Sequence, residues 1–301
     1  MRKSTTSESQ LVNITISGTG KTTFRTISTK RTGGRTYSIM KTLYCITLLL
    51  GAFVSAVLGG HKLNEAVFAR NPTRIKEIIE SGEEDVNHKI DDDEGMSALY
   101  AAAYIGNLEM MKLLLNDYNA DPMNGDSRGY SPIDMLSSRS MYEPVELLME
   151  AAAENIISNM LNERDGFSPL HRAAKNNDQQ AADIIQIMIE KGADPNTKSL
   201  PSSKKPGVTP LHIATEHGNN DMVSRLITMG ADVESADANG NTVLHIAAKN
   251  GNDKMMELLL DMGANVKAKN LANETPFDDV IRNNNLSSLS KKVQDALNAD
   301  L

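Results

Sequence analysis

Three histidines stand at equivalent places in the sequence, and they are the first side chains to consider for catalytic or metal-binding chemistry. His171, His212 and His245 each follow a leucine and lie three residues after a serine or threonine. Two zinc-binding histidines on one helix face are four residues apart, whereas His217 follows His212 by five. The single cysteine, Cys45, lies in an apolar run, which leaves no thiol for a cysteine–histidine nucleophile further along. One repeated position explains all three histidines, so the sequence predicts no catalytic residue, no metal site and no cofactor.

A phosphate-binding motif is the second candidate for chemistry. The segment SGTGKTT, residues 17–23, resembles the loop that cradles nucleotide phosphates, with Lys21 as its lysine. The full motif has a glycine five residues before Gly20, and this chain has Thr15 there. No succession of strand and helix follows to present Lys21 to a nucleotide. We therefore expect no nucleotide binding at this segment.

Short helices are the elements that must position the histidines. Thr242 can begin a helix because its side-chain oxygen accepts hydrogen bonds from the free backbone N–H groups of the first turn. Gly251 can end that helix, and Gly263 can end a second one, because glycine adopts the left-handed conformation at little cost. The second helix is expected to bury one apolar face, formed by Met255, Met256, Leu259, Leu260 and Met262. Two such helices cannot bury their faces alone and need stacked neighbours.

The same unit recurs along the chain. The segment VTPLHIATEHGNNDMVSRLITMGADVE begins at Val208, and FSPLHRAAKNNDQQAADIIQIMIEKGADPN begins at Phe167. A less regular first copy begins at Lys62. The residues expected to cap the first helix of the later units follow one another at intervals of 34, 37, 41, 33 and 33 residues: Ser97, Ser131, Ser168, Thr209, Thr242 and Thr275.

This pattern resembles the ankyrin repeat family, whose unit of about 33 residues carries T-P-L-H-x-A-A near its start and G-A-D-V-N near its end. The resemblance covers roughly residues 61–301. It implies an all-α solenoid of about seven helix–turn–helix repeats with β-turn loops, in a domain at residues 60–301. In this family the histidine of the motif hydrogen-bonds between neighbouring repeats, so the resemblance gives the three histidines a structural role.

Two units depart from the regular pattern. In the third unit, Asp134 replaces the histidine. The fourth unit has about three extra residues in its second helix and a long loop at residues 199–207. Insertions in repeat arrays go to the loop face, so Lys204 and Lys205 are expected to protrude.

The resemblance also implies a non-enzymatic module that binds a partner protein. In ankyrin arrays the partner contacts a concave face, which is formed by exposed positions of the first helices and by the loop tips. The corresponding helix positions in this chain are Tyr104, Lys175, Glu216 and Lys249, and the tips include Asp92, Arg128, Asp237, Asn239 and Asn270. Tyr104 is the favoured contact because it is aromatic where other repeats carry lysine or glutamate. We expect the array to be a monomer.

The net charge of −8 conceals two segments of opposite sign. Residues 1–59 hold eight lysines and arginines and one acid, which leaves 23 bases and 38 acids, a net of −15, for the remainder. An array that is so acidic repels phosphate backbones, so nucleic acid is not an expected partner. Residues 1–39 are basic and rich in serine and threonine, and they are expected to be disordered because they can bury little apolar surface.

Residues 40–59 are typical of an export signal. An uncharged apolar run at residues 43–58 follows Met40, which is an alternative start to Met1. The run predicts a cleaved signal peptide or an uncleaved signal anchor, and it is the part of the chain expected to form an apolar helix and to contact a membrane. Positive charge precedes it and acids follow, so the repeats are expected on the non-cytosolic side, secreted or membrane-anchored.

Two other readings of the leader stay open. Residues 1–39 have the composition of an organellar transit peptide. Alternatively, the start is misassigned and the chain is a cytoplasmic scaffold or adaptor. Export would expose two glycosylation candidates, Asn273 and Asn285, each followed two residues later by threonine or serine.

Overall fold

The protein is described by a computed structural model that covers residues 62–89, 95–152, 165–283 and 289–298. The basic segment 1–39 and the apolar run 43–58 lie outside these residues, and so do Asp92 and Asn285. Within the described residues every regular element is a helix, and the remaining backbone pairing consists of two isolated bridges. The expectation of an all-α fold is confirmed for this part of the chain.

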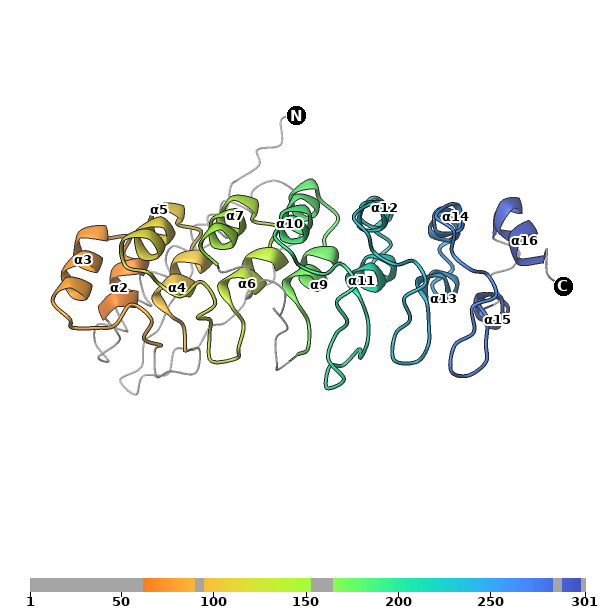
Figure 1. The fold of residues 1–301 in the computed structure, drawn as a ribbon, viewed down its shortest axis with the longest axis horizontal. Coiled ribbons are helices and arrows are strands. Elements are labelled where there is room, and N and C mark those ends of the chain that lie inside the picture. The colour runs from red at the N-terminus through yellow and green to blue at the C-terminus, as the bar shows by residue number, and fades with distance from the viewer. Residues whose placement is uncertain (1–61, 90–94, 153–164, 284–288, 299–301) are drawn as a thin grey trace, which may run out of the picture. The chain divides into compact units, whose positions relative to one another are not determined.

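The helices alternate between an inner and an outer layer, two to a repeat, as the sequence predicted (Figure 1). The inner layer consists of α2 (Lys62–Phe68), α4 (Ala98–Tyr104), α6 (Pro132–Ser138), α9 (Pro169–Ala174), α11 (Pro210–Glu216), α13 (Val243–Lys249) and α15 (Pro276–Arg282). The outer layer consists of α3 (Pro72–Glu80), α5 (Leu108–Lys112) with its π-helical continuation η1 (Leu113–Asp117), α7 (Tyr142–Ala151), α10 (Gln179–Glu190), α12 (Asn220–Thr228), α14 (Asp253–Asp261) and α16 (Lys291–Asn298).

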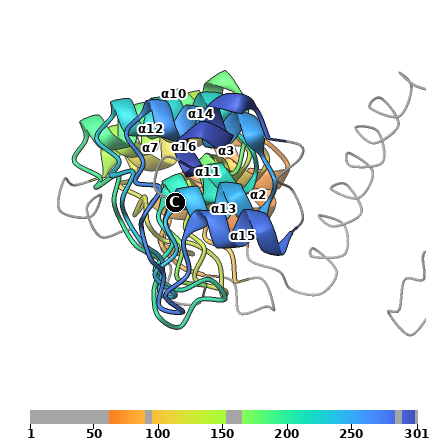
Figure 2. The same cartoon turned by 90° about the vertical axis from the view of Figure 1, so that its right-hand side faces the viewer.

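Each inner helix packs against its equivalents in the neighbouring repeats. The inner helices contact one another in succession, from α2 on α4 to α13 on α15. Outer helices stack in the same way, for example α7 on α10 and α12 on α14. Seen along the stack, the two layers lie one above the other, and the loops between repeats extend from the inner layer (Figure 2). The fold therefore presents one surface made of inner-helix ends and loops.

Polar caps fix the start of the inner helices. Each of the six predicted hydroxyl residues, from Ser97 to Thr275, occupies the capping position of an inner helix. Gly251 follows α13 at φ 62°, and Gly263 follows α14 at φ 89°, which are conformations that other residues adopt only at a cost. The predicted starts and stops of these helices are confirmed.

The core consists of small and flexible apolar side chains. Alanines and leucines of the inner layer are buried, and so are the paired methionines of the outer layer, Met110, Met111, Met255 and Met256. These methionines are core residues, as predicted. Met262 is an exception: 38% of it is exposed, so its predicted burial was wrong. It caps the end of α14, where the chain leaves the helix toward solvent.

The irregular fourth repeat has the predicted extra length. Its outer helix, α10, has 12 residues, whereas α12 and α14 have nine each. Asp178 caps the start of α10 and accepts a hydrogen bond from the backbone N–H of Ala181 at 2.8 Å. The insertion therefore extends an outer helix and leaves the inner layer in register.

Candidate functional site

The three repeated histidines are buried, and both nitrogens of each ring form hydrogen bonds. In each ring Nδ1 accepts from the backbone N–H of the capping residue three positions before it, at 3.1 Å for His171 and 3.2 Å for His212 and His245. Nε2 must then carry the proton, and it donates to a backbone carbonyl of the next repeat. The acceptors are Val208 at 2.9 Å, Asn241 at 3.1 Å and Glu274 at 3.1 Å, in that order.

This geometry makes the histidines structural. Burial lowers the pKa of His171 to about 4 and lowers that of His212 as well. A neutral ring with both nitrogens engaged has no lone pair for a metal and no proton to exchange with a substrate. The inter-repeat role that the family resemblance implied is confirmed.

An asparagine that the sequence analysis overlooked fills the same position in the first repeat. Asn64 is buried in α2 and donates from Nδ2 to the carbonyl of Met96 at 2.9 Å. Met96 directly precedes the capping Ser97, as Val208 precedes Thr209. The order Leu63-Asn64-x-Ala66, which matches Leu-His-x-Ala, was the available signal.

The third repeat replaces this bond by an ion pair. One carboxylate oxygen of Asp134 accepts from the backbone N–H of Ser131 at 3.0 Å, so the side chain takes the capping half of the histidine's role. The other oxygen accepts from Nε of Arg172 in the next repeat at 2.8 Å. Arg172 also pairs with Asp165 at 3.0 Å, and its guanidinium lies 4.7 Å from the ring centroid of Tyr130.

Burial and pairing act in opposite directions on this network. Burial raises the pKa of the Asp134 carboxyl, against the opposing effects of Arg172 and Ser131. Burial also disfavours the charge on Arg172, but Asp134 and Asp165 outweigh it and raise the pKa of the guanidinium. Arg172 donates from Nε to Asp134 and from Nη2 to Asp165, so the network joins the third and fourth repeats.

The loops between repeats are tight hairpins held by their own first residue. In the last two loops Asp237 and Asn270 each accept, at 2.8 to 3.0 Å, from the backbone N–H groups two and four residues on. Neighbouring loops also bond to each other through the main chain. Ala238 N–H donates to the carbonyl of Pro206 at 3.1 Å, and Leu271 N–H donates to that of Asn239 at 2.9 Å. The loops therefore form a connected row.

The predicted contact residues of the inner helices differ in exposure and in whether they already interact with another side chain. Lys175 and Lys249 are exposed and make no side-chain hydrogen bond or ion pair with any residue the structure describes. Glu216 is exposed but pairs with Lys205 at 2.5 Å. Tyr104 is half-buried, and the guanidinium of Arg139 lies 4.7 Å from its ring centroid. The structure thus brings these residues to one face, with two of them already engaged.

The predicted tip residues also fall into two groups. Asp237 and Asn270 are occupied in shaping their loops, whereas Asn239 is exposed. Arg128 is exposed and pairs with the buried Asp126 at 2.7 Å. The glycosylation candidate Asn273 is exposed, in the left-handed conformation at φ 63°.

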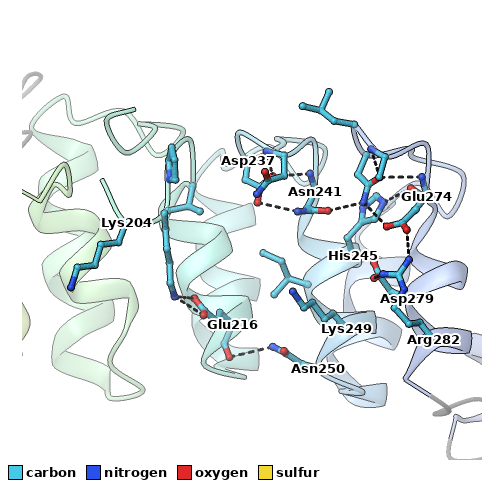
Figure 3. A pocket seen from close by; sticks show the side chains of 18 residues that line it. Lys204, Glu216, Asp237, Asn241, His245, Lys249, Asn250, Glu274, Asp279 and Arg282 are labelled. Atoms are coloured by element: carbon cyan, nitrogen blue, oxygen red, sulfur yellow. Dashed lines mark hydrogen bonds and ion pairs between the residues drawn. The ribbon is translucent and has the colours of Figure 1, made fainter. Parts of the chain in front are cut away.

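Two hollows lie between the loops and the inner helices. The larger, about 700 Å³, extends over α11, α13 and α15, with Glu216, Lys249 and Arg282 on its helix side (Figure 3). The smaller, about 380 Å³, lies over α9 and α11 and includes Phe167, Lys175 and Ile213. Lys204 and Lys205 of the long loop line both hollows, so the two adjoin at this loop, and together they are termed the groove. Lys204 and Lys205 are exposed, as predicted, but Lys205 folds back onto Glu216.

The described residues hold neither a metal-binding cluster nor a membrane-spanning helix. No group of three or more histidines, cysteines or carboxylates there could hold a metal ion. None of the helices described is long and apolar enough to span a bilayer.

Known proteins share this repeat pattern and this fold. A sequence profile described as ankyrin repeats in three copies matches residues 63–159 and 170–270, which is more than half of the chain. The ankyrin repeat and SOCS box protein 3 of Bos taurus is 34% identical over 174 residues, which cover 48% of this chain and 32% of that protein. The E3 ubiquitin-protein ligase KEG of Arabidopsis thaliana is 27% identical over 188 residues, which cover 62% of this chain and 10% of that protein. This chain thus spans a third or less of either relative.

The solved structures include the same stack of helix pairs. The crystal structure of the ankyrin repeat domain of Bcl-3 superimposes with a TM-score of 0.67 at 23% identity, over 79% of this chain and 98% of that one. At this identity the likeness establishes the fold alone, whereas the profile match establishes the family. The chain belongs to the ankyrin repeat family, whose repeats form a module for protein–protein interaction.

Proposed function

We propose that this chain is a non-enzymatic binding module that holds a partner protein in the groove between its loop row and the ends of its inner helices. The observation that carries the proposal is the groove itself, which combines exposed side chains with a connected backbone wall. Two kinds of side chain could have catalytic chemistry: the three histidines and the Asp134–Arg172 pair. All of them are engaged in hydrogen bonds or ion pairs between neighbouring repeats.

Preorganisation supports a binding role for this face. The loops bond to themselves and to each other, so they are held in one conformation before a partner arrives. A rigid surface loses less conformational entropy on association, and this improves affinity without any added contact. The predicted contacts Lys175, Glu216, Lys249 and Asn239 are all exposed on this side.

Site-specific photo-crosslinking tests the location of the partner. A photoreactive amino acid is placed at Lys175 or Lys249 in the groove, and in control variants at Lys76, Lys191 or Lys254, which are exposed on the opposite layer. We expect one partner protein to be crosslinked in cells from the groove positions and not from the outer ones. Crosslinking from the outer positions alone would refute the proposal.

We further propose that the repeats act on the non-cytosolic side of a membrane. The support is in the sequence, where positive charge precedes the apolar run 43–58 and acids follow it. An intracellular scaffold with a misassigned start or an organellar leader is the alternative. Sequencing the N-terminus of the natural protein separates them: a first residue between about 57 and 60 supports export, and a soluble form that retains Met1 rejects it.

Glycosylation gives an independent test of export. Asn273 is exposed in a loop, so the glycosylation machinery of a secretory compartment can reach it. The mass of the protein expressed in eukaryotic cells should fall on glycosidase treatment, and less so in the Asn273→Gln variant. An unchanged mass would contradict luminal exposure.

A further inference from the structure

Charge is distributed unevenly over the two layers of the array. The outer helices α3, α5, α7, α10, α12, α14 and α16 and the segment η1 carry twice as many acidic as basic side chains. The groove differs, because lysines of the inner helix ends and of the long loop line it. The array is acidic as a whole, but its groove is not.

Most acids that line the groove already pair with a basic side chain. Glu216 pairs with Lys205 at 2.5 Å. Glu274 and Asp279 both pair with Arg282, the latter at 3.1 Å. The remaining ones are Asp165, which pairs with Arg172, and Asp237, which accepts backbone N–H groups of its own loop. These carboxylates are therefore not available to bind a basic partner.

Three lysines of the groove do not take part in these ion pairs. Lys175, Lys204 and Lys249 are exposed and form no ion pair with any residue in the described part of the chain. Lys175 and Lys204 belong to the fourth repeat and Lys249 to the sixth, and all three line the two hollows. In Figure 3 Lys204 points away from Glu216. The two hollows are lined by six basic and five acidic side chains, and these three lysines are the bases among them that form no ion pair with a described residue.

Apolar side chains line the same two hollows as these lysines. Phe167 and Ile213 line the smaller hollow, and Ile246 and Leu271 line the larger. Leu271 is 81% exposed at a loop tip, so its side chain is accessible to a ligand. A ligand that fits the groove needs both carboxylates for the lysines and an apolar side chain to cover these residues.

We propose that the partner presents an extended, carboxylate-rich segment with interspersed aliphatic side chains, and that this segment lies along the groove on Lys175, Lys204 and Lys249. This inference rests on the proposed function and specifies its partner class. The aliphatic side chains cover Phe167 and Leu271 and supply buried area. The lysines accelerate association and exclude basic segments, because exposed charges act mainly on encounter and selectivity.

Glu216 acts as an internal competitor in this arrangement. It already pairs with Lys205, on the long loop that lines both hollows. A carboxylate of the partner has to displace Glu216 to reach that lysine. The Glu216→Gln variant should therefore bind an acidic segment more tightly, although an ordinary contact residue would lose affinity when altered.

The test uses a fluorescein-labelled peptide of glutamates interrupted by single leucines as probe, with the full chain. Its affinity is compared between K175E/K204E/K249E and the matched outer-layer variant K76E/K191E/K254E, which changes the net charge by the same amount. We expect the groove variant to weaken binding by at least about ten-fold and the outer variant by less than about two-fold. The Glu216→Gln variant should strengthen binding by about two- to three-fold.

Several outcomes would overturn this inference. Equal effects of the groove and outer variants would show that only overall charge matters. Tighter binding of the lysine–leucine counterpart of the peptide, or equally tight binding of a single-stranded oligodeoxynucleotide, would reject a carboxylate-rich partner. If photo-crosslinking captures a partner in the groove but the acidic peptide does not bind, the proposed function stands and this inference fails.

Discussion

At the scale of single residues, the array differs from one junction to the next in how it joins its repeats. Three junctions use a neutral histidine that donates to a carbonyl, and the first uses Asn64. The junction of the third and fourth repeats uses the Asp134–Arg172 ion pair instead. The two kinds of junction respond differently to substitution and to pH.

Removal of Arg172 should be more harmful than removal of an exposed arginine. Arg172→Ala leaves the buried Asp134 without its partner, so we expect a loss of about 3 kcal/mol in the free energy of unfolding. Arg74→Ala is the control, because its ion pairs with Glu77 and Glu83 are exposed and should be worth less than about 1 kcal/mol. Urea denaturation monitored by circular dichroism measures both. Equal losses would contradict a buried, coupled pair.

Acid should weaken the histidine junctions. The pKa of His171 is lower in the folded chain, about 4, than in an unfolded one, so the unfolded state binds the additional proton first. Stability is therefore full above about pH 6.5 and falls as the pH drops toward 4, by about 1.4 kcal/mol per pH unit for one such histidine.

The His171→Asn variant isolates this effect. It should be less stable at about pH 7, where the bond to Val208 is present in the parent, yet show a slope shallower by one proton below about pH 6. Denaturation curves at several pH values measure the slope. A slope that does not change in the variant would show that His171 is not the titrating group.

At the scale of elements, the loops are joined more closely than the sequence suggested. Gly240 has φ 78°, and a β-carbon there would lie 2.8 Å from the backbone nitrogen of Leu271 in the next loop. Gly263 also has a positive φ, of 89°, but nothing lies within 4 Å of its would-be β-carbon. The two glycines separate the cost of conformation from the cost of contact.

Alanine at these two glycines should therefore have unequal effects. Gly263→Ala should lower the free energy of unfolding by about 1 kcal/mol, because the alanine must adopt the left-handed conformation. Gly240→Ala adds a clash with the neighbouring loop, so we expect a loss of about 2–4 kcal/mol. Thermal unfolding of the two variants gives the comparison, and losses within experimental error of each other would show that the loops do not depend on this close approach.

The periodic elements could be predicted from sequence, because capping hydroxyls, stop glycines and apolar faces act locally. The ion pair of Asp134 with Arg172 could not be predicted, because it joins residues that are far apart in the sequence. Arg172 stands where Ile213 and Ile246 stand in later repeats, and Asp134 stands at the histidine position one repeat earlier. Each departure was visible alone, but their pairing is a tertiary contact. For the same reason Glu216 could be predicted as exposed, but its ion pair with Lys205 could not.

At the scale of the whole molecule, each repeat depends on its neighbours for burial. Such a stack gains stability from repeats and their interfaces, and regions with fewer neighbours open more readily. A substitution in the middle should therefore loosen adjacent repeats before distant ones.

The Leu226→Ala variant tests this local propagation. Leu226 is fully buried in α12, so the cavity should cost about 2–5 kcal/mol. Amide hydrogen exchange followed by mass spectrometry should rise in α9–α10 and α13–α14 and change little in α2–α3. Ile281→Ala, at a residue that is 54% exposed, is the control and should leave exchange unchanged. A uniform rise over all repeats would indicate a single cooperative unit.

The main-chain bonds between neighbouring loops have a consequence for how such a surface can diversify. Ala238 and Leu271 join the row through backbone atoms, so the bond does not depend on the side chain that either position carries. Exposed tip side chains such as Lys204, Asn239 and Leu271 can therefore be exchanged without loss of the wall that holds them. Mutation can rewrite which partner is recognised while the scaffold stays folded, so stability and specificity can evolve separately.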